Sequence, residues 1–265
     1  MINKVHNENC LETMSRMENA FIDLTVTSPP YDNLRNYNGY EFDFEAIAKE
    51  LFRVTKPGGV VVWVVGDATI KGSETGTSFK QALFFKECGF NLHDTMIYQK
   101  ENYVPLTHNR YEQSFEYMFI LSKGKPKTFN GIKRLSKLAG KSVNRKNTNR
   151  ALEGSTRNRN ESTIIRKEKL APNIFKYVIG KKTNNGNHTA AFPEQLAKDH
   201  IISWSNENDI VYDPFSGSGT TAKMSIVNNR CFIGSEISEE YCKISEQRIR
   251  KQVREKVVDT EEEEV

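Results

Sequence analysis

"DIVYDPFSGSGTTAKMSIVNNRCFIGSEIS", residues 209–238, contains the pattern that decides the fold. Its apolar beginning predicts a buried strand over 209–215, and a helix is predicted over 220–229. The turn between them contains Gly217 and Gly219, which allow a backbone to approach a ligand closely. The helix that follows presents unpaired N–H donors at its N-terminus. This order of elements is typical of a ligand site at the edge of a sheet.

A second predicted strand, over 230–237, brings Glu236 to its end, where a carboxylate can accept hydrogen bonds from ribose hydroxyls. The turn is not a P-loop, because no Lys follows the glycines, and it lacks the third glycine of G-x-G-x-x-G. Asp213, at the end of the first strand, suits a cationic amino group better than a pyrophosphate. These features predict a nucleoside cofactor and favour S-adenosylmethionine. The alternative to a cofactor site is an ordinary strand–helix turn with a capping acid.

Strands and helices alternate over most of the remaining sequence. The run "VVVWVV" is continuously apolar, which is typical of a strand covered on both faces of a parallel sheet. Ser78 is expected to cap one helix, and Pro193 lies in the first turn of another. Strands are predicted over 20–26, 60–65, 92–100 and 115–123, and helices over 42–54, 78–90, 192–205 and 238–256. The predicted fold class is therefore α/β, with a doubly wound, mostly parallel, Rossmann-like sheet.

Basic residues are concentrated in one part of the chain. The whole chain has 265 residues and a net charge of +4, but the segment 123–182 contains eighteen Lys or Arg and three acids. This segment therefore carries +15, and the rest of the chain carries −11. Such asymmetry indicates binding to a polyanion, with a solvated loop as the alternative. Because 124–171 also interrupts the alternation of strands and helices and has few aromatics, we interpret it as an inserted segment.

Composition also narrows the cellular setting. Hydrophobic residues form 37% of the chain, and no run of about 18 apolar residues occurs that would indicate a membrane span. The N-terminal stretch "MINKVHNENC" lacks the apolar core of a signal peptide. The four cysteines are scattered without metal-ligand spacing, so we expect reduced thiols and no metal site. The sequence therefore predicts a cytoplasmic protein that does not associate with a membrane.

A second motif, "TSPPY" at 27–31, follows the predicted strand 20–26. Two consecutive prolines cannot donate hydrogen bonds to a sheet, so they end this strand and make a rigid corner. Ser28 precedes the prolines, and Tyr31 follows them. Considered alone, this motif favours an ordinary Ser-Pro-Pro turn next to a surface tyrosine.

"TSPPY" and "DPFSGSGT", in this order, resemble the motifs of the β-type amino-group DNA methyltransferases. "KPGGVVVWVVGD", "FEYMFILSKG" and "HTAAFPEQLAKDHI" are further matches. The resemblance implies that a catalytic half precedes a cofactor half, that S-adenosylmethionine is the methyl donor, and that duplex DNA is the partner. It also implies that the basic insertion is the target-recognition segment. The expected divisions are 1–123 for the catalytic half, 124–171 for this segment, 172–255 for the cofactor half and 256–265 for an acidic flexible tail.

The resemblance assigns residues to each part of the site. The catalytic corner consists of Ser28, Pro29, Pro30 and Tyr31. Members of the family often have Asp at a "GDC"-like position near the adenine, where this chain has Asn-Cys. The expected cofactor contacts are Asn9, Cys10, Thr27, His188, Phe192, Asp213, Phe215, Ser216, Gly217, Ser218, Gly219, Thr220 and Glu236. The expected DNA contacts are Lys133, Arg134, Lys137, Lys141, Arg145, Lys146, Arg150, Arg157 and Arg159.

The chemistry of methyl transfer gives the proline corner a function. The lone pair of an exocyclic amine is delocalised into the base, and acceptors that hold its N–H groups out of the ring plane localise it. Ser28 Oγ and the Pro29 carbonyl can be those acceptors, and Tyr31 can stack on a base flipped out of the duplex. Methylation at cytosine C5 needs a cysteine nucleophile, but no Pro-Cys occurs in the chain. Within the family, Ser at position 28 favours cytosine N4 as the target, and adenine N6 is the alternative.

Other functions stay open at this stage. A catalytically inactive DNA-binding relative would retain the fold, although the intact motif residues of both halves argue against it. Amino groups of RNA or protein are alternative substrates. The basic insertion favours duplex DNA over them. A homodimer and a cognate restriction enzyme also stay open as partners. The recognition sequence depends on a loop geometry that the sequence does not provide.

Overall fold

The computed structural model describes residues 1–30, 42–103, 109–150, 153–178 and 193–263 of the chain. The chain divides into two compact units. The larger consists of Met1–Asn130 and Asn173–Val265, and the smaller consists of Gly131–Pro172. Residues just before the smaller unit are hydrogen-bonded within the larger one, for example through Lys127 N, which donates to Gly58 O at 2.9 Å.

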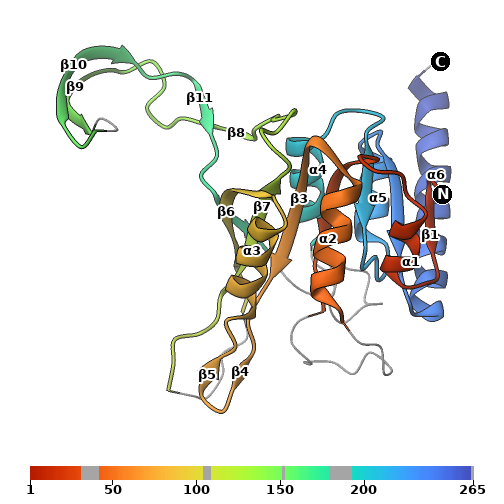
Figure 1. Cartoon of the computed structure of the whole chain (residues 1–265). Helices are drawn as coiled ribbons and strands as arrows, with labels where there is room; N and C mark the ends of the chain where they lie inside the picture. The colour runs from red at the N-terminus through yellow and green to blue at the C-terminus, as the bar shows by residue number, and fades with distance from the viewer. Residues whose placement is uncertain (31–41, 104–108, 151–152, 179–192, 264–265) are drawn as a thin grey trace. The chain divides into compact units, whose positions relative to one another are not determined.

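An eight-stranded sheet forms the centre of the larger unit, with the strand order β1-β14-β13-β2-β3-β7-β6-β12 (Figure 1). β7 is antiparallel to β3 and β6, and all other neighbouring strands of this sheet are parallel. The prediction of a mostly parallel sheet is therefore confirmed. The strands are β1 (Lys4–His6), β2 (Ile22–Thr27), β3 (Thr55–Val65), β6 (Asn91–Lys100), β7 (Phe115–Ser122), β12 (Ile174–Tyr177), β13 (Ile210–Asp213) and β14 (Cys231–Ser235).

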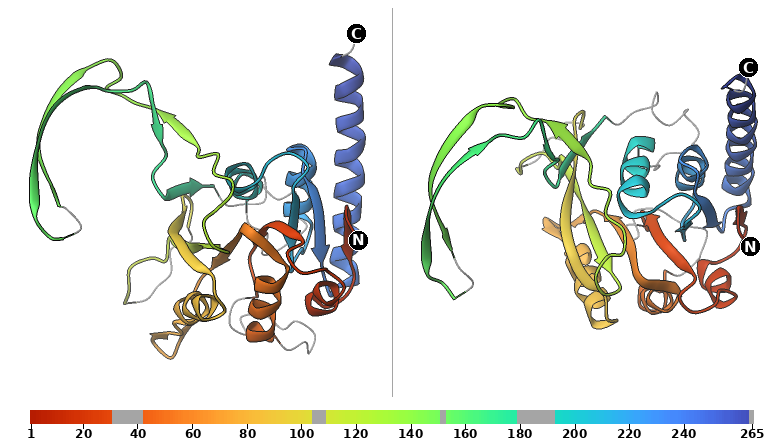
Figure 2. Two further views of the ribbon diagram at one scale, coloured as in Figure 1. Left: turned by 45° about the horizontal axis from the view of Figure 1, so that its top comes forward. Right: turned by 90° about the horizontal axis from the view of Figure 1, so that it is seen from above.

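Helices cover both faces of this sheet (Figure 2). The chain proceeds from β2 to β3 in one direction along the sheet, and from β13 to β14 in the opposite direction. Because β2 and β13 are neighbours, the strand order reverses between them. In doubly wound sheets, ligands bind outside the carboxyl ends of the strands at such a reversal. One face carries α1 (Cys10–Ser15), α2 (Phe44–Val54) and α3 (Thr77–Glu87), and the other carries α4 (Glu194–Trp204), α5 (Thr220–Val227) and α6 (Glu239–Glu263).

The run "VVVWVV" lies at the centre of the core. β3 is buried along 60–65, as expected for a strand covered on both faces. Trp63 is completely buried and packs edge-on against Phe85, with ring centroids 5.1 Å apart. Its Nε1 donates a 2.8 Å hydrogen bond to Oε1 of the buried Gln81 on α3. This bond satisfies two polar groups, each of which would cost about 1–3 kcal/mol if it were buried without a partner.

The N-terminus of α3 differs from the sequence prediction. Gly76, not Ser78, is the N-cap, with a φ of 65°. Asp67, which follows β3, accepts a 2.9 Å hydrogen bond from Ser78 N and a second bond from Ser78 Oγ. A carboxylate from the end of another element therefore caps this helix. The segment between β3 and α3 contains a short hairpin of β4 (Thr69–Ile70) and β5 (Ser73–Glu74).

α6 also differs from the prediction. The sequence predicts an acidic flexible tail over 256–265, but α6 continues to Glu263. Lys256 Nζ donates a 2.7 Å hydrogen bond to the carbonyl oxygen of Ile226, which attaches this part of α6 to the end of α5. The helical turns that precede the acidic block are thereby held in place. None of the helices in the described part of the chain has the length and apolar character needed to cross a membrane.

The smaller unit is built from antiparallel strands that the sequence does not predict. β8 (Lys133–Leu135) pairs with β11 (Glu168–Leu170), and β9 (Ser142–Arg150) pairs with β10 (Thr156–Ile164). The side chains of Leu135, Leu138, Ile164 and Leu170 in this unit are exposed, and those of Ile132 and Ile165 are half-buried. Backbone pairing rather than a buried core therefore organises the smaller unit.

A buried histidine on α4 makes the stability of the larger unit sensitive to pH. The Nε2 atom of His200 lies 3.2 Å from Met118 Sδ, and its ring stacks on Phe175. Burial lowers the pKa of His200 to about 4. The unfolded imidazole binds a proton near pH 6.5, so the unfolded state gains a proton at a higher pH than the folded state does. The stability that depends on neutral His200 is complete above about pH 6.5 and is lost as the pH falls towards 4.

We expect His200→Leu to remove this dependence while keeping an apolar side chain in the same place. Relative to the variant, the native protein should lose up to about 1.4 kcal/mol of unfolding free energy per pH unit between pH 6.5 and 4. Urea unfolding of both proteins at pH 7, 6 and 5 measures this difference. A difference that does not change with pH would contradict a buried neutral imidazole.

Candidate active site

The sequence-predicted residues meet at one edge of the sheet. β1, β14, β13, β2 and β3 are parallel, so their carboxyl ends lie at the same edge (Figure 1). Ser28 directly follows β2, Asp213 ends β13, and Glu236 directly follows β14. β13 lies between β2 and β14. The turn that contains Gly217 and Gly219 (the glycine turn) and the proline corner therefore leave the sheet from neighbouring strands, at the point where the strand order reverses.

A hydrogen bond connects the two motifs directly. Thr27 Oγ1 donates to Asp213 Oδ1 at 2.6 Å, and both residues are buried. The same carboxylate oxygen accepts a 3.0 Å hydrogen bond from Phe215 N. These bonds hold the Asp213 carboxylate at the start of the glycine turn and beside the end of β2. The two motifs, 186 positions apart in the chain, thus share one carboxylate.

The buried carboxyl of Asp213 has a raised pKa. Burial raises the pKa of its carboxyl to about 6, and the hydrogen bonds from Thr27, Phe215 N and Thr221 oppose this rise. The nearby Glu236 raises the pKa slightly further. At neutral pH the carboxylate is charged in surroundings that disfavour its charge. A cationic amino group placed beside it would relieve this penalty and lower its pKa.

The turn between β13 and α5 depends on glycine. Gly217 and Gly219 have φ values of 50° and 78°, in the region that side chains other than glycine rarely adopt. A Cβ at Gly219 would lie 2.2 Å from Ser245 Oγ on α6. Ser216 N donates to Ser235 O at 2.9 Å, which ties the turn to the end of β14. The backbone at Gly219 is therefore closely packed against α6.

Charged residues on three helices, α4, α5 and α6, hold this turn in place. Arg248 on α6 donates to the carbonyl oxygen of Ser218 at 2.7 Å and to its Oγ at 2.8 Å. Glu194 on α4 accepts from Arg248 and from Lys223, each at 2.8 Å. The sequence does not predict these contacts, because each of them joins residues of separate elements.

Glu236 closes the other side of the turn. Its Oε2 accepts a 2.8 Å hydrogen bond from Gly217 N, and its Oε1 accepts one of the same length from Ser238 N. Burial raises the pKa of this carboxyl, and the backbone hydrogen bonds oppose the rise. Each carboxylate oxygen keeps further acceptor capacity, which suits a pair of vicinal hydroxyls.

The loop after β1 lies at the same edge of the sheet. Asn9 is the N-cap of α1, and its Oδ1 accepts a 2.9 Å hydrogen bond from Leu11 N. Cys10 is buried, and burial raises the pKa of its thiol to about 12. The predicted Asn-Cys pair therefore lies at this edge, with one residue used as a cap and the other as a small apolar side chain.

A buried hydrogen-bond chain supports this loop from below. Tyr212 Oη lies 2.9 Å from Ser235 Oγ, which donates to Thr13 Oγ1 at 2.8 Å. Thr13 Oγ1 in turn donates to Glu8 Oε1 at 2.7 Å. The chain runs from β13 through β14 to α1. Sequence reasoning missed it, because its members come from three separate elements.

The proline corner is held close to this arrangement. Pro29 is buried and Ser28 is half-buried. Thr221 Oγ1 on α5 donates a 3.1 Å hydrogen bond to the carbonyl oxygen of Val26, which fixes the end of β2. Tyr31, together with His188 and Phe192 from the predicted cofactor contacts, lies outside the described residues.

The remaining predicted cofactor residues belong to the turn. Phe215 packs its ring edge-on against Phe42 and Trp63, so it joins the core beneath the site. Ser216, Ser218 and Thr220 are buried. The predicted DNA contacts lie in the smaller unit: Lys133 and Arg134 on β8, Lys137 and Lys141 in the following segment, Arg145, Lys146 and Arg150 on β9, and Arg157 and Arg159 on β10.

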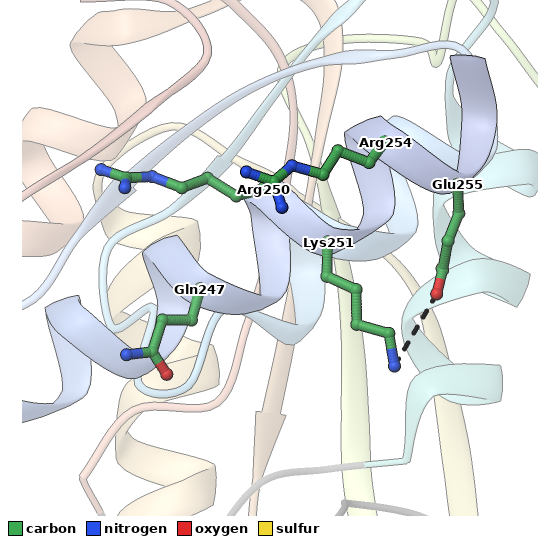
Figure 3. Close-up of a pocket in the computed structure, with 5 residues that line it drawn as sticks. All are labelled: Gln247, Arg250, Lys251, Arg254 and Glu255. Atoms are coloured by element: carbon green, nitrogen blue, oxygen red, sulfur yellow. Dashed lines mark ion pairs between the residues drawn. The ribbon is translucent and has the colours of Figure 1, made fainter. Parts of the chain in front are cut away.

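A pocket elsewhere in the larger unit contains none of the predicted site residues. It lies along α6 and brings together the cationic side chains of Arg250, Lys251 and Arg254 with Gln247 and Glu255 (Figure 3). Lys251 and Glu255 form an ion pair at 3.7 Å. Among the described residues, no group of three or more His, Cys, Asp or Glu side chains is arranged to hold a metal ion.

A family model described as DNA methylase, with the short name N6_N4_Mtase, matches residues 22–247. The chain belongs to this family of DNA methylases. The resemblance to amino-group DNA methyltransferases, inferred from the two motifs, is therefore confirmed. The matched region contains the proline corner, the glycine turn and Glu236 after β14.

Individual relatives agree with this family. The methylase is 56% identical over 235 residues to the orphan methyltransferase M.BamHII of Bacillus amyloliquefaciens. This alignment covers 86% of this chain and 89% of the relative. Its structure is similar to that of the PvuII DNA methyltransferase (cytosine-N4-specific), with a TM-score of 0.66 and 21% identity over 92% of this chain and 87% of that one. It is also similar to the DNA modification methylase TTHA0409 of Thermus thermophilus, solved in complex with S-adenosyl-L-methionine. That comparison has a TM-score of 0.63 and 22% identity over 94% of this chain and 95% of that one. The Rossmann-like fold is thus confirmed.

The hydroxyl of Thr27 should help to keep Asp213 charged in the methylase. Thr27→Val removes this donor and keeps the branched shape, so we expect the pKa of Asp213 to rise further above about 6. Carboxyl carbon shifts measured by NMR between pH 4 and 8 give the pKa in both proteins. Thr69→Val on the exposed β4 is the matched control and should leave the titration unchanged. An identical Asp213 titration in Thr27→Val would show that the hydroxyl does not stabilise the carboxylate.

Proposed function

We propose that this DNA methylase transfers a methyl group from S-adenosylmethionine to an exocyclic amino nitrogen of a base in duplex DNA. Cytosine N4 is the favoured target, and adenine N6 is the alternative. The observation that carries the proposal is the 2.6 Å hydrogen bond between Thr27 and Asp213. It joins the start of the catalytic motif to the start of the cofactor turn, so a donor and an acceptor of the methyl group can meet at one edge of the sheet.

The residues of the turn fit the cofactor chemically. Asp213 offers a carboxylate to the amino group of the methionine part, and Glu236 offers spare acceptors to the ribose hydroxyls. Gly217 and Gly219 leave room for the backbone to approach. The Asn9–Cys10 loop is proposed to lie against the adenine. The bound cofactor supplies an electrophilic methyl group on a sulfonium. The other proposed contacts are Thr27, Phe215, Ser216, Ser218 and Thr220, with His188 and Phe192 outside the described residues.

The proline corner is proposed to activate the target amine. Ser28 Oγ and the Pro29 carbonyl oxygen accept hydrogen bonds from the amine and turn its lone pair out of the plane of the base. Pro29 is buried, and prolines have fixed φ angles, so these acceptors are held in position before the base arrives. The base must leave the duplex to reach them, and Tyr31 is proposed to stack on it.

The cysteines support an amino nitrogen rather than a ring carbon as the target. Methylation at cytosine C5 requires a thiolate that adds to the ring. Burial raises the pKa of Cys10 to about 12 and that of Cys242 to about 11, and it also raises the pKa of Cys88. These thiols are protonated at neutral pH and are poor nucleophiles. The preference for cytosine N4 rests on Ser28, since Asp or Asn at this position is more common in the adenine enzymes of the resembled family.

The smaller unit is proposed to bind the DNA. This unit belongs to a segment of net charge +15, so contacts of its basic residues with phosphates would give an affinity that falls steeply with salt. A cytoplasmic location is part of this proposal, because the substrate is cellular DNA. A homodimer and a cognate restriction enzyme stay open as partners.

The proline corner can be tested by Ser28→Ala. The variant loses one acceptor that acts on the developing charge at the amine, so turnover should fall by about 10²–10³-fold. The affinity for S-adenosylmethionine should stay within about twofold of the native value, and Ser15→Ala on the exposed part of α1 should methylate normally. The assay follows labelled methyl transfer to duplex DNA, RNA and protein, and nucleoside mass spectrometry distinguishes N4-methylcytosine from N6-methyladenine. Native turnover in Ser28→Ala would contradict the role of the corner, and absence of transfer by the native protein would support an inactive relative.

The cofactor assignment can be tested by the pH dependence of binding. A cationic ligand needs the Asp213 carboxylate, whose pKa is about 6 without a ligand, so affinity for S-adenosylmethionine should fall as the pH drops below 6. The fall should approach tenfold per pH unit. Asp213→Asn keeps an acceptor for Thr27 and Phe215 N, yet it should bind more weakly and without this pH dependence. Calorimetric titrations between pH 5 and 8 measure both proteins, with Asp209→Asn as the control. A pH-independent native affinity would contradict the assignment.

A further inference from the structure

The strands β9 and β10 form a two-stranded antiparallel ribbon that is the most extended part of the smaller unit (Figure 2). Each strand has nine residues, which corresponds to a length of about 30 Å. One turn of DNA is about 34 Å long, and its major groove is about 12 Å wide and admits a two-stranded ribbon. The ribbon therefore has the dimensions of an element that lies in a major groove.

The composition of the ribbon is not explained by packing. Val143 and Ile164 are its only large apolar residues, and both lie at the same end, because Val143 pairs with Thr163 and Ile164 with Ser142. A strand pair that buries one face normally alternates apolar and polar residues. This ribbon has polar or charged residues along both faces over the rest of its length. Its side-chain types therefore serve something other than a core.

The register sorts these residues into two faces. Residues at alternate positions share a face of a strand, and here odd positions pair with odd positions across the ribbon. The odd face consists of 143, 145, 147 and 149 on β9 and 157, 159, 161 and 163 on β10. The even face consists of 142, 144, 146, 148 and 150 on β9 and 156, 158, 160, 162 and 164 on β10. The odd face carries three of the four arginines of the ribbon.

On the odd face, two successive cross-strand pairs set an arginine opposite an asparagine. Asn149 pairs with Arg157, and Asn147 pairs with Arg159. Arginine binds guanine O6 and N7 with two hydrogen bonds, and asparagine binds adenine N6 and N7 in the same way. Directly opposed residues lie about 4.5–5.5 Å apart, and alternate residues along a strand lie about 6.8 Å apart, which is close to two base-pair steps. These four positions therefore form an array on the scale of a few neighbouring base pairs.

We propose that the ribbon enters the major groove with its odd face towards the base edges, and that Asn147, Asn149, Arg157 and Arg159 determine the preferred methylation site. This inference rests on the proposed function. Lys146 and Arg150, on the even face, add positive charge and affinity but no site preference. Arg145, opposite Glu161, lies further along the odd face, where the paired charges partly neutralise each other.

The inference is tested by the methylation profile of variants over a library of duplex sequences. Asn147→Ala and Arg159→Ala should each lower discrimination at one or two base positions by about 5–150-fold, because a bidentate base contact is lost. Asn158→Ala and Asn160→Ala, which change the same residue type on the even face, should keep the native profile. Binding of S-adenosylmethionine at native affinity shows that the larger unit is folded in every variant.

Arg157→Lys separates base readout from phosphate contact. Lysine keeps the charge but lacks the planar fork, so site preference should relax while the dependence of affinity on salt stays unchanged. A native protein that methylates no DNA would overturn the proposed function and this inference together. A native protein with a clear site preference that survives unchanged in Asn147→Ala, Arg157→Lys and Arg159→Ala would overturn this inference alone. Loss of preference in the even-face variants instead would also overturn it.

Discussion

The hydrogen bond from Thr27 to Asp213 is the contact on which the rest of the site depends. A buried carboxylate is unfavourable unless donors satisfy it, and Thr27 and Phe215 N supply two of them. They fix the carboxylate where two neighbouring strands end. Burial still raises its pKa to about 6, so part of the cost stays unrelieved until a cation arrives. One interaction thereby sets both the geometry of the two motifs and the charge for which the site is prepared.

The arrangement of β13, the glycine turn, α5 and β14 could be predicted from the sequence because its signals are local. Asp213, Gly217, Gly219 and Glu236 lie within a single strand–turn–helix–strand stretch, so their order alone places them at one sheet edge. No local sequence signal places the proline corner beside these residues. The corner lies there because β2 pairs with β13. Short elements such as β1 and β12 were missed, because three or four residues show no periodicity.

The contacts that stiffen the turn could not be predicted in the same way. Ser245 and Arg248 look like ordinary residues of a charged helix, yet one would meet any Cβ at Gly219 and the other holds Ser218. The capping of α3 by Asp67 instead of Ser78 has the same cause. In each case a polar group finds its partner on an element whose position is decided by packing of the whole sheet. Sequence patterns describe the face that a residue occupies but not what lies opposite that face.

The two kinds of strand in this protein differ in how freely their side chains can change. β13 and β14 are buried, so most substitutions there would alter the packing beneath the site. β9 and β10 are joined by backbone pairing and carry few apolar residues, so their side chains contribute little to the burial that stabilises a core. Substitutions on the ribbon should therefore be nearly additive with those in the larger unit. A polar ribbon of this kind permits new side-chain patterns without loss of fold, and the buried ends of β13 and β14 do not.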